Sequence, residues 1–334
     1  MSATLFAKLS GVPMVAVTGT RGKTTTTIMI AHILKTGGKK VILGGNVQGV
    51  SNLQLLKSVK PNSIAVFELD SWQLQGFGTS KISPDVAVFT TLFPDHMKYY
   101  GDDMQKYFND KANIFKYQKS NDIFVVGNQA LPFVHKWGGK IISKMVTPIN
   151  ELPKGWKLKI PGEHNIYDAS LAIEVARSMG LKDLVIKKGI ESFKGVSGRL
   201  ELVKSVKGVK YYNDTTATTP EATIAALRAL GEEGDIILIA GGSDKGLDMT
   251  ALLHEIPKYT KAVFLLSGTG TEKIKHELPN SVEVNDLKKT VLLAKKLASK
   301  GDIILLSPAF ASFGMFKNEY DRGEQFNKIV KSLK

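Results

Sequence analysis

The chain has 334 residues, 43% of them apolar, 23% charged and none of them cysteine, which allows two domains with full cores and excludes disulfides, thiolate nucleophiles and thiolate metal sites. No apolar run approaches the ~20 residues that cross a bilayer, and the N-terminus lacks the features of a signal peptide, so we expect a cytoplasmic protein that is not transmembrane. The formal net charge is +14, and the lysines are spread over the whole chain without a basic run interleaved with aromatic residues. We therefore expect no nucleic-acid partner. A lysine-rich proteome or a preference for anionic small substrates explains the charge.

Residues 1–11 are expected to be only a short lead into the first strand. The following stretch, residues 12–34, joins a buried apolar run, a turn with two glycines and a run with helical spacing. The turn, residues 19–24, suits a triphosphate, because its glycines let backbone N–H groups approach phosphate oxygens, Lys23 adds a positive charge and the Thr24 hydroxyl can hold Mg²⁺. An ordinary turn with a solvated lysine has the same short pattern, but the strand before it and the helix after it favour a nucleotide phosphate site.

Apolar runs and helical segments alternate through the first half of the chain. Strands are expected at residues 39–43, 63–69, 85–92 and 122–126, with a helix at residues 102–118 and short strands and turns over residues 127–160. This alternation predicts an α/β fold with a mostly parallel, doubly wound sheet. Glu68 and Asp70 end one strand, and Asp95 and His96 follow another, which is where open α/β sheets bind ligands.

The second half repeats this organisation after a glycine-rich, polar stretch at residues 194–199. A helix is expected at residues 165–179, and further strands at 209–213, 235–240, 262–266 and 302–306, with helices at 220–230 and 248–257. We therefore predict two domains: a P-loop central ATP-binding domain over residues 1–197 and a Rossmann-like α/β domain over residues 198–334, with a hinge near Gly198.

Three groups are candidates for a magnesium centre beside the phosphates: Thr24, Glu68, and His96 together with Asp95. Mg²⁺ prefers oxygen ligands and tolerates an imidazole, and all of these residues would come from strand ends at one edge of the sheet. Taken singly, Glu68 could cap a helix and His96 could be a hydrogen-bonded loop histidine. Together with a phosphate loop at the same edge, they favour metal binding.

Nine separated motifs, in order along the chain, resemble those of the Mur ligases, most closely the D-glutamate-adding members. They are T-G-T-R-G-K-T-T-T (18–26), E-L-D-S-W-Q-L (68–74), P-D-H-M-K-Y-Y-G (94–101), D-K-A-N-I-F (110–115), G-E-H-N (162–165), G-R-L-E-L-V (198–203), N-D-T-T-A-T-T-P-E-A-T (213–223), A-G-G-S-D-K-G (240–246) and L-S-P-A-F-A-S-F-G-M-F-K-N (306–318). The resemblance implies an ATP-dependent amide-bond ligase of peptidoglycan precursor synthesis, in which ATP phosphorylates an acceptor carboxylate and an amino acid displaces the phosphate.

The resemblance also implies roles for individual residues. Those assigned to ATP, Mg²⁺ or phosphoryl transfer are Thr20, Gly22, Lys23, Thr24 and Thr25 (phosphates), Glu68 and His96 (magnesium), and Asn165, Arg199 and Asp214 (nucleotide). Those assigned to the substrates are Asn46 with the loop at residues 44–49 (acceptor), and Thr218, Lys245, Ser312 and Phe313 (incoming amino acid). Lys111 matches the family lysine that is carbamylated, although a plain surface lysine on a helix has the same pattern. Closure about the hinge is expected to bring Lys245 to the acyl phosphate.

The chain departs from the family pattern at several positions: Asp70 for a serine, Asp168 for an asparagine, Thr216 for a lysine, Gly314 for an aspartate and Glu319 for an aromatic residue. The last three surround the expected amino-acid pocket, so the incoming amino acid stays open. The resemblance starts near residue 12, so the family's N-terminal domain, which binds the UDP-sugar end of the acceptor, is expected to be missing. The acceptor is then expected to be smaller, lipid-linked or presented by a separate acceptor-binding protein.

Other functions stay open at this point. A folylpolyglutamate-synthase-like enzyme, or a ligase or amidating enzyme of lipid-linked cell-wall precursors, shares the phosphate loop and the lysine. A non-ligating nucleotide-binding protein would bind ATP without amino-acid-stimulated phosphate release. A basic nucleic-acid-dependent NTPase would show salt-sensitive binding of DNA or RNA.

Overall fold

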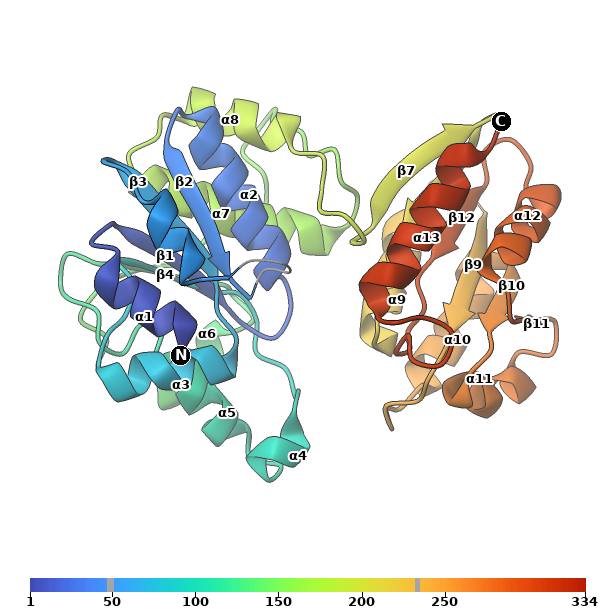
Figure 1. Ribbon diagram of the computed structural model, residues 1–334, viewed down its shortest axis with the longest axis horizontal. Coiled ribbons are helices and arrows are strands. Elements are labelled where there is room, and N and C mark those ends of the chain that lie inside the picture. Colours follow the sequence, from blue (N-terminus) through green and yellow to red (C-terminus); the bar gives the residue numbers. More distant parts are fainter. Residues whose placement is uncertain (47–50, 232–234) are drawn as a thin grey trace. The chain divides into compact units, whose positions relative to one another are not determined.

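The fold was analysed in a computed structural model that describes residues 1–46, 51–231 and 235–334. The chain forms two compact units, one of residues Met1–Lys159 and His164–Lys194, the other of residues Ile160–Glu163 and Gly195–Lys334. The functional division predicted after residue 197 stays a prediction, since a compact unit need not coincide with a functional domain. Each unit is described by itself below (Figure 1).

The first unit is built on a parallel sheet of buried apolar strands. In spatial order its strands are β2 (Lys40–Gly45), β3 (Ser63–Glu68), β1 (Met14–Thr18), β4 (Val86–Phe89), β5 (Ile123–Val126) and β6 (Lys144–Val146). All neighbouring pairs run parallel. Strands β1, β3 and β4 are buried at every position, as expected for a sheet covered on both faces.

Helices cover both faces of this sheet (Figure 1). They are α1 (Ser2–Leu9), α2 (Lys23–Thr36), α3 (Ser71–Ser80), α4 (Met97–Tyr100), α5 (Met104–Ala112), α6 (Leu131–Trp137), α7 (Glu163–Ser178) and α8 (Asp183–Ser192), with a 3₁₀ turn at Gln54–Ser58. Residues of α1, α3, α5 and α6 share one core with β1, β3, β4 and β5. This arrangement confirms the predicted doubly wound fold.

Two segments differ in kind from the sequence prediction, and the helix expected at residues 102–118 is the shorter α5. The expected lead at residues 1–11 contains α1, because Phe6 is fully buried and stacks on Phe67 of β3 with ring centroids 4.7 Å apart. Residues 127–160 contain α6, whose Val134 is buried and whose Trp137 packs on Phe108. Both helices are short, so packing against the sheet rather than periodicity stabilises them.

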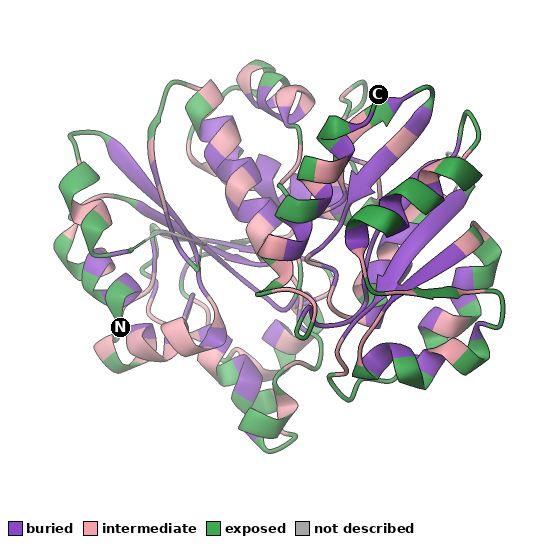
Figure 2. Ribbon diagram, turned by 45° about the vertical axis from the view of Figure 1, so that its right-hand side comes forward, coloured by how far each residue is buried: buried purple, intermediate pink, exposed green. Residues whose placement is uncertain are grey.

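The second unit contains another sheet with one reversed edge strand. In spatial order its strands are β11 (Val282–Val284), β10 (Thr260–Leu266), β9 (Ile236–Gly241), β12 (Ile303–Leu306), β8 (Val209–Asn213) and β7 (Glu201–Val206). The pair β7 and β8 is antiparallel and the other pairs are parallel. Figure 2 shows that the inner strands of the sheets are buried, whereas the edge strands β6, β7 and β11 are partly exposed and the helices expose their outer faces.

Two separate cores lie on the two faces of the second sheet. Its helices are α9 (Pro220–Leu230), α10 (Thr250–Tyr259), α11 (Thr269–Ile274), α12 (Leu287–Leu297) and α13 (Glu319–Ser332), with a 3₁₀ turn at Lys275–Glu277. Helices α9 and α10 contribute to one core. Helices α12 and α13 contribute to the other. In the part of the chain that the structure describes, no helix is long and apolar enough to cross a membrane.

Candidate active site

The predicted phosphate loop follows β1 and leads into α2. Gly22 is the N-cap residue of α2 and has a φ of 83°, a left-handed conformation that favours glycine. Gly19 has a φ of 144°, and a Cβ atom built on it would lie 2.0 Å from Oγ1 of Thr90. The two glycines therefore allow a close turn at the helix N-terminus, whose N–H groups and dipole favour an anion.

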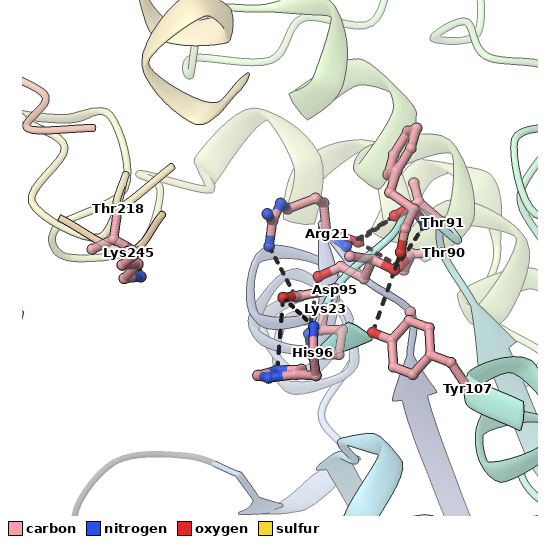
Figure 3. A network of polar contacts seen from close by, with 12 residues as sticks. Arg21, Lys23, Thr90, Thr91, Asp95, His96, Tyr107, Thr218 and Lys245 are labelled. Carbon is pink, nitrogen blue, oxygen red and sulfur yellow. Dashed lines mark hydrogen bonds and ion pairs between the residues drawn. The ribbon is translucent and has the colours of Figure 1, made fainter. Parts of the chain in front are cut away.

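Thr90 and Thr91, just after β4, hold the loop by hydrogen bonds (Figure 3). The Oγ1 atom of Thr90 donates to the carbonyl of Arg21 at 2.5 Å, and Oγ1 of Thr91 accepts from the Arg21 N–H at 2.9 Å. The carbonyl of Thr91 accepts from the Thr20 N–H at 2.7 Å. The sequence analysis did not assign this support, for which two threonines at the end of an apolar strand are the available signal.

Thr20 is buried and faces the protein interior. Its Oγ1 donates to the Phe93 carbonyl at 3.1 Å and lies 3.5 Å from the hydroxyl oxygen of Tyr107. Burial raises the pKa of Tyr107 to about 12, so its hydroxyl is neutral at ordinary pH. The Thr20 side chain therefore holds the loop in place. The predicted contact between Thr20 and a phosphate stays a prediction.

Lys23, Thr24 and Thr25 form the first turn of α2. The Nζ atom of Lys23 donates to the Thr20 carbonyl at 3.2 Å, so the ammonium group folds back over the loop. Thr24 is half-buried and Thr25 is buried. The structure places these residues at the helix N-terminus, where a phosphate would meet both the backbone N–H groups and a lysine.

Lys111 is buried beside the loop and is not a surface lysine. Its side chain comes from the last turn of α5, and its residue is 1% exposed. The Nζ atom donates to the Gly19 carbonyl at 2.9 Å and lies 4.7 Å from the centre of the Tyr107 ring. Burial lowers the pKa of Lys111 well below its usual value, and the positive charge of Lys23 lowers it further. A lowered pKa leaves more of the amine in its neutral form, which is the form that acts as a nucleophile.

Glu68 ends β3, next to β1 in the sheet, and its residue is 3% exposed. Within the described residues its Oε2 atom has no hydrogen-bond partner. Glu68 does not cap the following helix, because Asp70 does so, with its side chain accepting from the Gln73 N–H at 2.7 Å. A buried carboxylate oxygen without a partner is costly, so this atom fits a cation ligand.

His96 and Asp95 lie close to the same loop. His96 has a φ of 55° and its ring packs edge-on against Trp72, with centroids 4.6 Å apart. Asp95 pairs with Arg21 of the phosphate loop at 3.4 Å, and Nε2 of His96 lies 3.8 Å from Asp95 (Figure 3). Among residues 1–46, 51–231 and 235–334, no group of three or more His, Cys, Asp or Glu side chains is arranged to hold a metal.

Two further candidates lie on other segments of the first unit. Asn46 follows β2, and its N–H donates to the Glu68 carbonyl at 2.7 Å, while residues 47–49 of the expected acceptor loop lie outside the described residues. Asn165 is buried in the first turns of α7. Asp168, one turn further, approaches the phosphate loop so closely that a Cβ on Gly22 would lie 2.3 Å from its Oδ1.

In the second unit, both carboxylate oxygens of Asp214 accept hydrogen bonds. Oδ1 accepts from the Leu200 N–H at 3.0 Å and Oδ2 from the Ser307 hydroxyl at 2.8 Å. Burial raises the pKa of Asp214 to about 7, against the effect of these hydrogen bonds and of Arg199. Asp214 therefore ties the start of β7 to the end of β12, and its nucleotide contact and that of Arg199 stay predictions.

Three loops at the strand ends of the second unit meet around the residues expected to bind the amino acid. Nζ of Lys245 donates to Oγ1 of Thr218 at 2.9 Å. Ser243 pairs with Ala311 through two backbone hydrogen bonds of 2.9 and 3.1 Å. Ser312 is buried and Phe313 is 65% exposed. The loops at 213–219, 241–246 and 307–313 thus form one cluster.

Arg322 of α13 supports this cluster and was missed by the sequence analysis. Its residue is fully buried, and its guanidinium donates to the Thr215 carbonyl at 2.9 Å, to Thr215 Oγ1 at 3.1 Å and to the Phe310 carbonyl at 3.4 Å. Burial lowers the pKa of Arg322 to about 10. Its place in an amphipathic helix gave no signal, because arginine is usually exposed.

Comparisons with known protein families identify both units. The profile for the Mur ligase middle domain matches residues 17–148, and the profile for the Mur ligase glutamate ligase domain matches residues 198–310. The chain is 35% identical to UDP-N-acetylmuramoylalanine--D-glutamate ligase of Roseiflexus sp., over 100% of this chain and 79% of that protein. It is 38% identical to the enzyme of the same name from Clostridium botulinum, over 95% of this chain and 74% of that protein.

Solved structures share the fold. UDP-N-acetylmuramate-alanine ligase MurC from Thermotoga maritima matches with a TM-score of 0.73 and 22% identity, over 99% of this chain and 78% of that one. MurF ligase from Thermotoga maritima in complex with ADP matches with a TM-score of 0.75 and 20% identity, over 99% of this chain and 84% of that one. E. coli FolC in complex with ADP matches with a TM-score of 0.73 and 17% identity, over 99% of this chain and 93% of that one.

Proposed function

This chain belongs to the Mur ligase family, as its nine motifs predicted, and on that premise we propose that it is an ATP-dependent ligase that joins an amino acid to an acceptor carboxylate. The observation that supports this most is the phosphate loop at residues 19–24 with two buried ionisable side chains beside it, Glu68 and Lys111. A nucleotide-binding turn alone would need neither of them.

ATP is the nucleotide that this site fits. The relatives are named as ligases, and several solved structures of the same fold contain ADP or an ATP analogue. In the proposed mechanism the loop N–H groups and Lys23 bind the phosphates. The acceptor carboxylate attacks the γ-phosphorus, the bond to the bridging oxygen breaks and ADP leaves. Lys23 offsets the charge that develops on the transferred phosphoryl group.

The donor set at the sheet edge fits Mg²⁺. Glu68 presents a buried oxygen without a partner in the described residues, and the Thr24 hydroxyl lies in the helix turn that follows the loop. Thr24 and Glu68 would hold one ion and His96 a second, which is our proposal from the family motif. Bound Mg²⁺ would neutralise phosphate charge and orient the γ-phosphate for attack.

We further propose that Lys111 is carbamylated. Burial lowers its pKa and so raises the share of neutral amine, whose nitrogen can attack CO₂, form an N–C bond and release one proton. The product is a carboxylate at a position that now carries an amine, next to the phosphate loop. A negative group there would suit a cation, whereas the amine hydrogen-bonds the Gly19 carbonyl.

The second step uses the amino acid. Its amine attacks the acyl carbon, the C–N bond forms, inorganic phosphate leaves and the amine loses a proton. Lys245 and Thr218, joined by a hydrogen bond, together with Ser312 are proposed to bind its carboxylates. Phe313 is exposed beside Ser312 and is proposed to contact the same substrate.

D-Glutamate is the first amino acid to test, because the relatives are named D-glutamate ligases. The first acceptor to test is UDP-N-acetylmuramoyl-L-alanine, as their names indicate. A separate acceptor-binding protein stays a prediction. Folylpolyglutamate synthesis is the second candidate, and its solved structures share only the fold with this chain.

A phosphate-release screen tests the proposal. Purified protein is mixed with Mg²⁺-ATP, one acceptor and one amino acid, and the product is identified by mass spectrometry. We expect release that needs both substrates and a ligated product with D-glutamate. The Lys23→Ala variant should lose this signal, and Lys39→Ala, which changes an exposed lysine, should keep it. An ATP hydrolysis rate that no acceptor or amino acid changes, or that DNA stimulates, would contradict the proposed ligase activity.

A further inference from the structure

Helix α12 of the second unit carries leucine and lysine together on its exposed face. Its inner face packs on the sheet through Leu287, Val291 and Ala294, which belong to the core shared with α13. On the outer face Leu292, Leu293 and Leu297 are 41%, 42% and 54% exposed. The burial of the inner face explains the helix, but it does not explain three leucines turned to water.

Lysines surround these leucines. Lys288 and Lys289 lie one turn before Leu292 and Leu293, and Lys296 lies beside Leu297, all of them exposed. Lys300 is exposed just after the helix. Lys288, Lys289, Leu292, Leu293, Lys296, Leu297 and Lys300 are called the α12 face below.

The α12 face has no carboxylate of its own. Residues 287–300 contain no Asp or Glu. The nearest acids in sequence are engaged: the Asp286 side chain caps α12 by accepting from the Lys289 N–H at 2.9 Å, Asp302 pairs with Lys261, and Glu283 pairs with Lys275 at 3.4 Å. Helix α13, which packs against α12, adds the exposed Lys328 and Lys331, and Lys334 is exposed just after α13. The positive charge is therefore not cancelled locally.

We propose that the α12 face docks on the surface of a bilayer that contains anionic phospholipid. A helix that carries both leucine and lysine can lie flat on a membrane surface. Its apolar side chains then insert at the boundary between headgroups and acyl chains, and its ammonium groups lie among the headgroups. The long lysine stems allow this without burying the charge. Nucleic acid would use the lysines but gains nothing from three exposed leucines, so it fits this surface less well.

The location of the face supports this occupant. Helix α12 connects the edge strand β11 to β12, and it lies on the outside of the second unit (Figure 1). None of the residues proposed to bind ATP, metal or substrate lies on α12 or α13. Docking through the α12 face would therefore leave the loops at 213–219, 241–246 and 307–313 unchanged, and the proposal stands apart from the ligase activity.

The test is co-sedimentation of the full chain with vesicles of equimolar phosphatidylglycerol and phosphatidylcholine, and with vesicles of phosphatidylcholine alone. Two variants separate the forces. Leu292→Gln with Leu293→Gln and Leu297→Gln removes the apolar side chains and keeps the charge. Lys288→Gln with Lys289→Gln and Lys296→Gln removes the charge and keeps the leucines. Leu184→Gln with Lys188→Gln, exposed on α8 of the first unit, is the matched control.

We expect binding to anionic vesicles only, weakened by salt. Since each lysine near such a surface contributes about fivefold in affinity, either α12 variant should lower the partition coefficient at least about tenfold. The control should bind as the unchanged chain does, and all variants should keep the same melting temperature and phosphate release. Three results would overturn the proposal. The first is no binding to anionic vesicles, and the second is equal vesicle binding by the leucine variant and the unchanged chain. The third is duplex DNA that displaces the vesicles from the unchanged chain and binds the leucine variant with unchanged affinity.

Discussion

The Nζ atom of Lys111 donates a hydrogen bond to the Gly19 carbonyl at 2.9 Å, which joins the end of α5 to the first residue of the phosphate loop. The lysine is buried, and its nearest charges include the ammonium of Lys23 and three carboxylates, Asp70, Asp95 and Glu68. This contact between the predicted phosphate loop and a buried amine of lowered pKa is the feature on which the proposed carbamate of Lys111 rests.

Replacing this amine by a guanidinium should stop the reaction. Arginine keeps its charge and does not form a carbamate, so we expect Lys111→Arg to lower kcat about 100-fold or more, the size of effect seen when a charge-stabilising group is lost. Lys116→Arg, at an exposed position soon after α5, should have no effect. Steady-state phosphate release measures both.

The same experiment separates a carbamate from a plain amine. The unchanged chain should lose activity in buffer freed of CO₂ and regain it with bicarbonate, whereas the Lys111→Arg variant should respond to neither. Full activity without CO₂ would show that the amine itself is the working group.

Glu68 should matter for metal rather than for folding. Without metal, a buried carboxylate oxygen lacking a partner is unfavourable, so Glu68→Gln should melt at the same temperature as the unchanged chain or higher. With Mg²⁺-ATP the unchanged chain should gain about 3 kcal/mol when the ligand is at a hundredfold its Kd, and the variant clearly less. Calorimetry with and without EDTA measures this. Glu151→Gln, an exposed change, is the control, and equal Mg²⁺ shifts in all three proteins would remove Glu68 from the metal site.

Gly19 should be more sensitive to alanine than Gly38. Both have positive φ, at 144° and 76°, so each substitution costs about 1 kcal/mol in backbone strain. Gly38 has open space, whereas a Cβ on Gly19 would lie 2.0 Å from Thr90 Oγ1 and 2.9 Å from the Thr91 nitrogen. We expect Gly19→Ala to lose measurable ATP binding by isothermal titration and Gly38→Ala to retain it. Equal affinities would mean that the loop is not held by Thr90 and Thr91.

The fold could be predicted because its strands are buried apolar runs. Residues 63–69 were expected as a strand and form β3 (Ser63–Glu68), and the alternation of such runs with helical segments was enough for the doubly wound sheets. The helices α1 and α6 were not predicted, since a helix of eight or seven residues has little periodicity and depends on what it packs against.

The position of the candidate site in the fold was predictable, but the contacts that support it were not. Lys23 and Glu68 were expected at one sheet edge from motif spacing, and strands β1 and β3 are indeed neighbours. That Lys111 is buried was not foreseeable, because a lysine on a polar helix is usually exposed. The hydrogen bonds from Thr90 and those from Arg322 depend on tertiary approach, about which neighbours in sequence carry no information.

Asp214 should make the second unit less stable as pH rises. Its pKa is about 7 when folded, by burial, and about 3.8 when unfolded, so between these values the folded chain holds a proton that the unfolded chain has released. Stability from this group is full below about pH 4 and is lost as pH rises through 7, to a total of about 4 kcal/mol. Asp214→Asn should flatten this dependence.

Urea unfolding followed by far-ultraviolet circular dichroism at several pH values measures the slope. Tryptophan fluorescence would not report unfolding of the second unit, since Trp72, Trp137 and Trp156 all lie in the first unit. Asp235→Asn, at an exposed position, should keep the slope of the unchanged chain. A variant at position 214 with the original slope would assign the pH dependence to another group.

Arg322 should set the affinity for the amino acid without touching it. Its guanidinium donates to Thr215 and to the Phe310 carbonyl, and the two loops that contain these residues carry Thr218 and Ser312. Lysine keeps the charge but has no planar fork, so Arg322→Lys should leave a buried carbonyl without its donor and lower the free energy of unfolding by about 2 kcal/mol. The KM for the amino acid should rise at least about tenfold and the KM for ATP by less, because the second unit supplies only Arg199 and Asp214 of the proposed nucleotide contacts, whereas the phosphate loop belongs to the first unit. Arg228→Lys, which alters an exposed arginine paired with Glu255 and keeps its positive charge, should change neither stability nor KM appreciably. If both KM values rose together, Arg322 would be needed for the fold of the second unit as a whole and not for the position of these two loops.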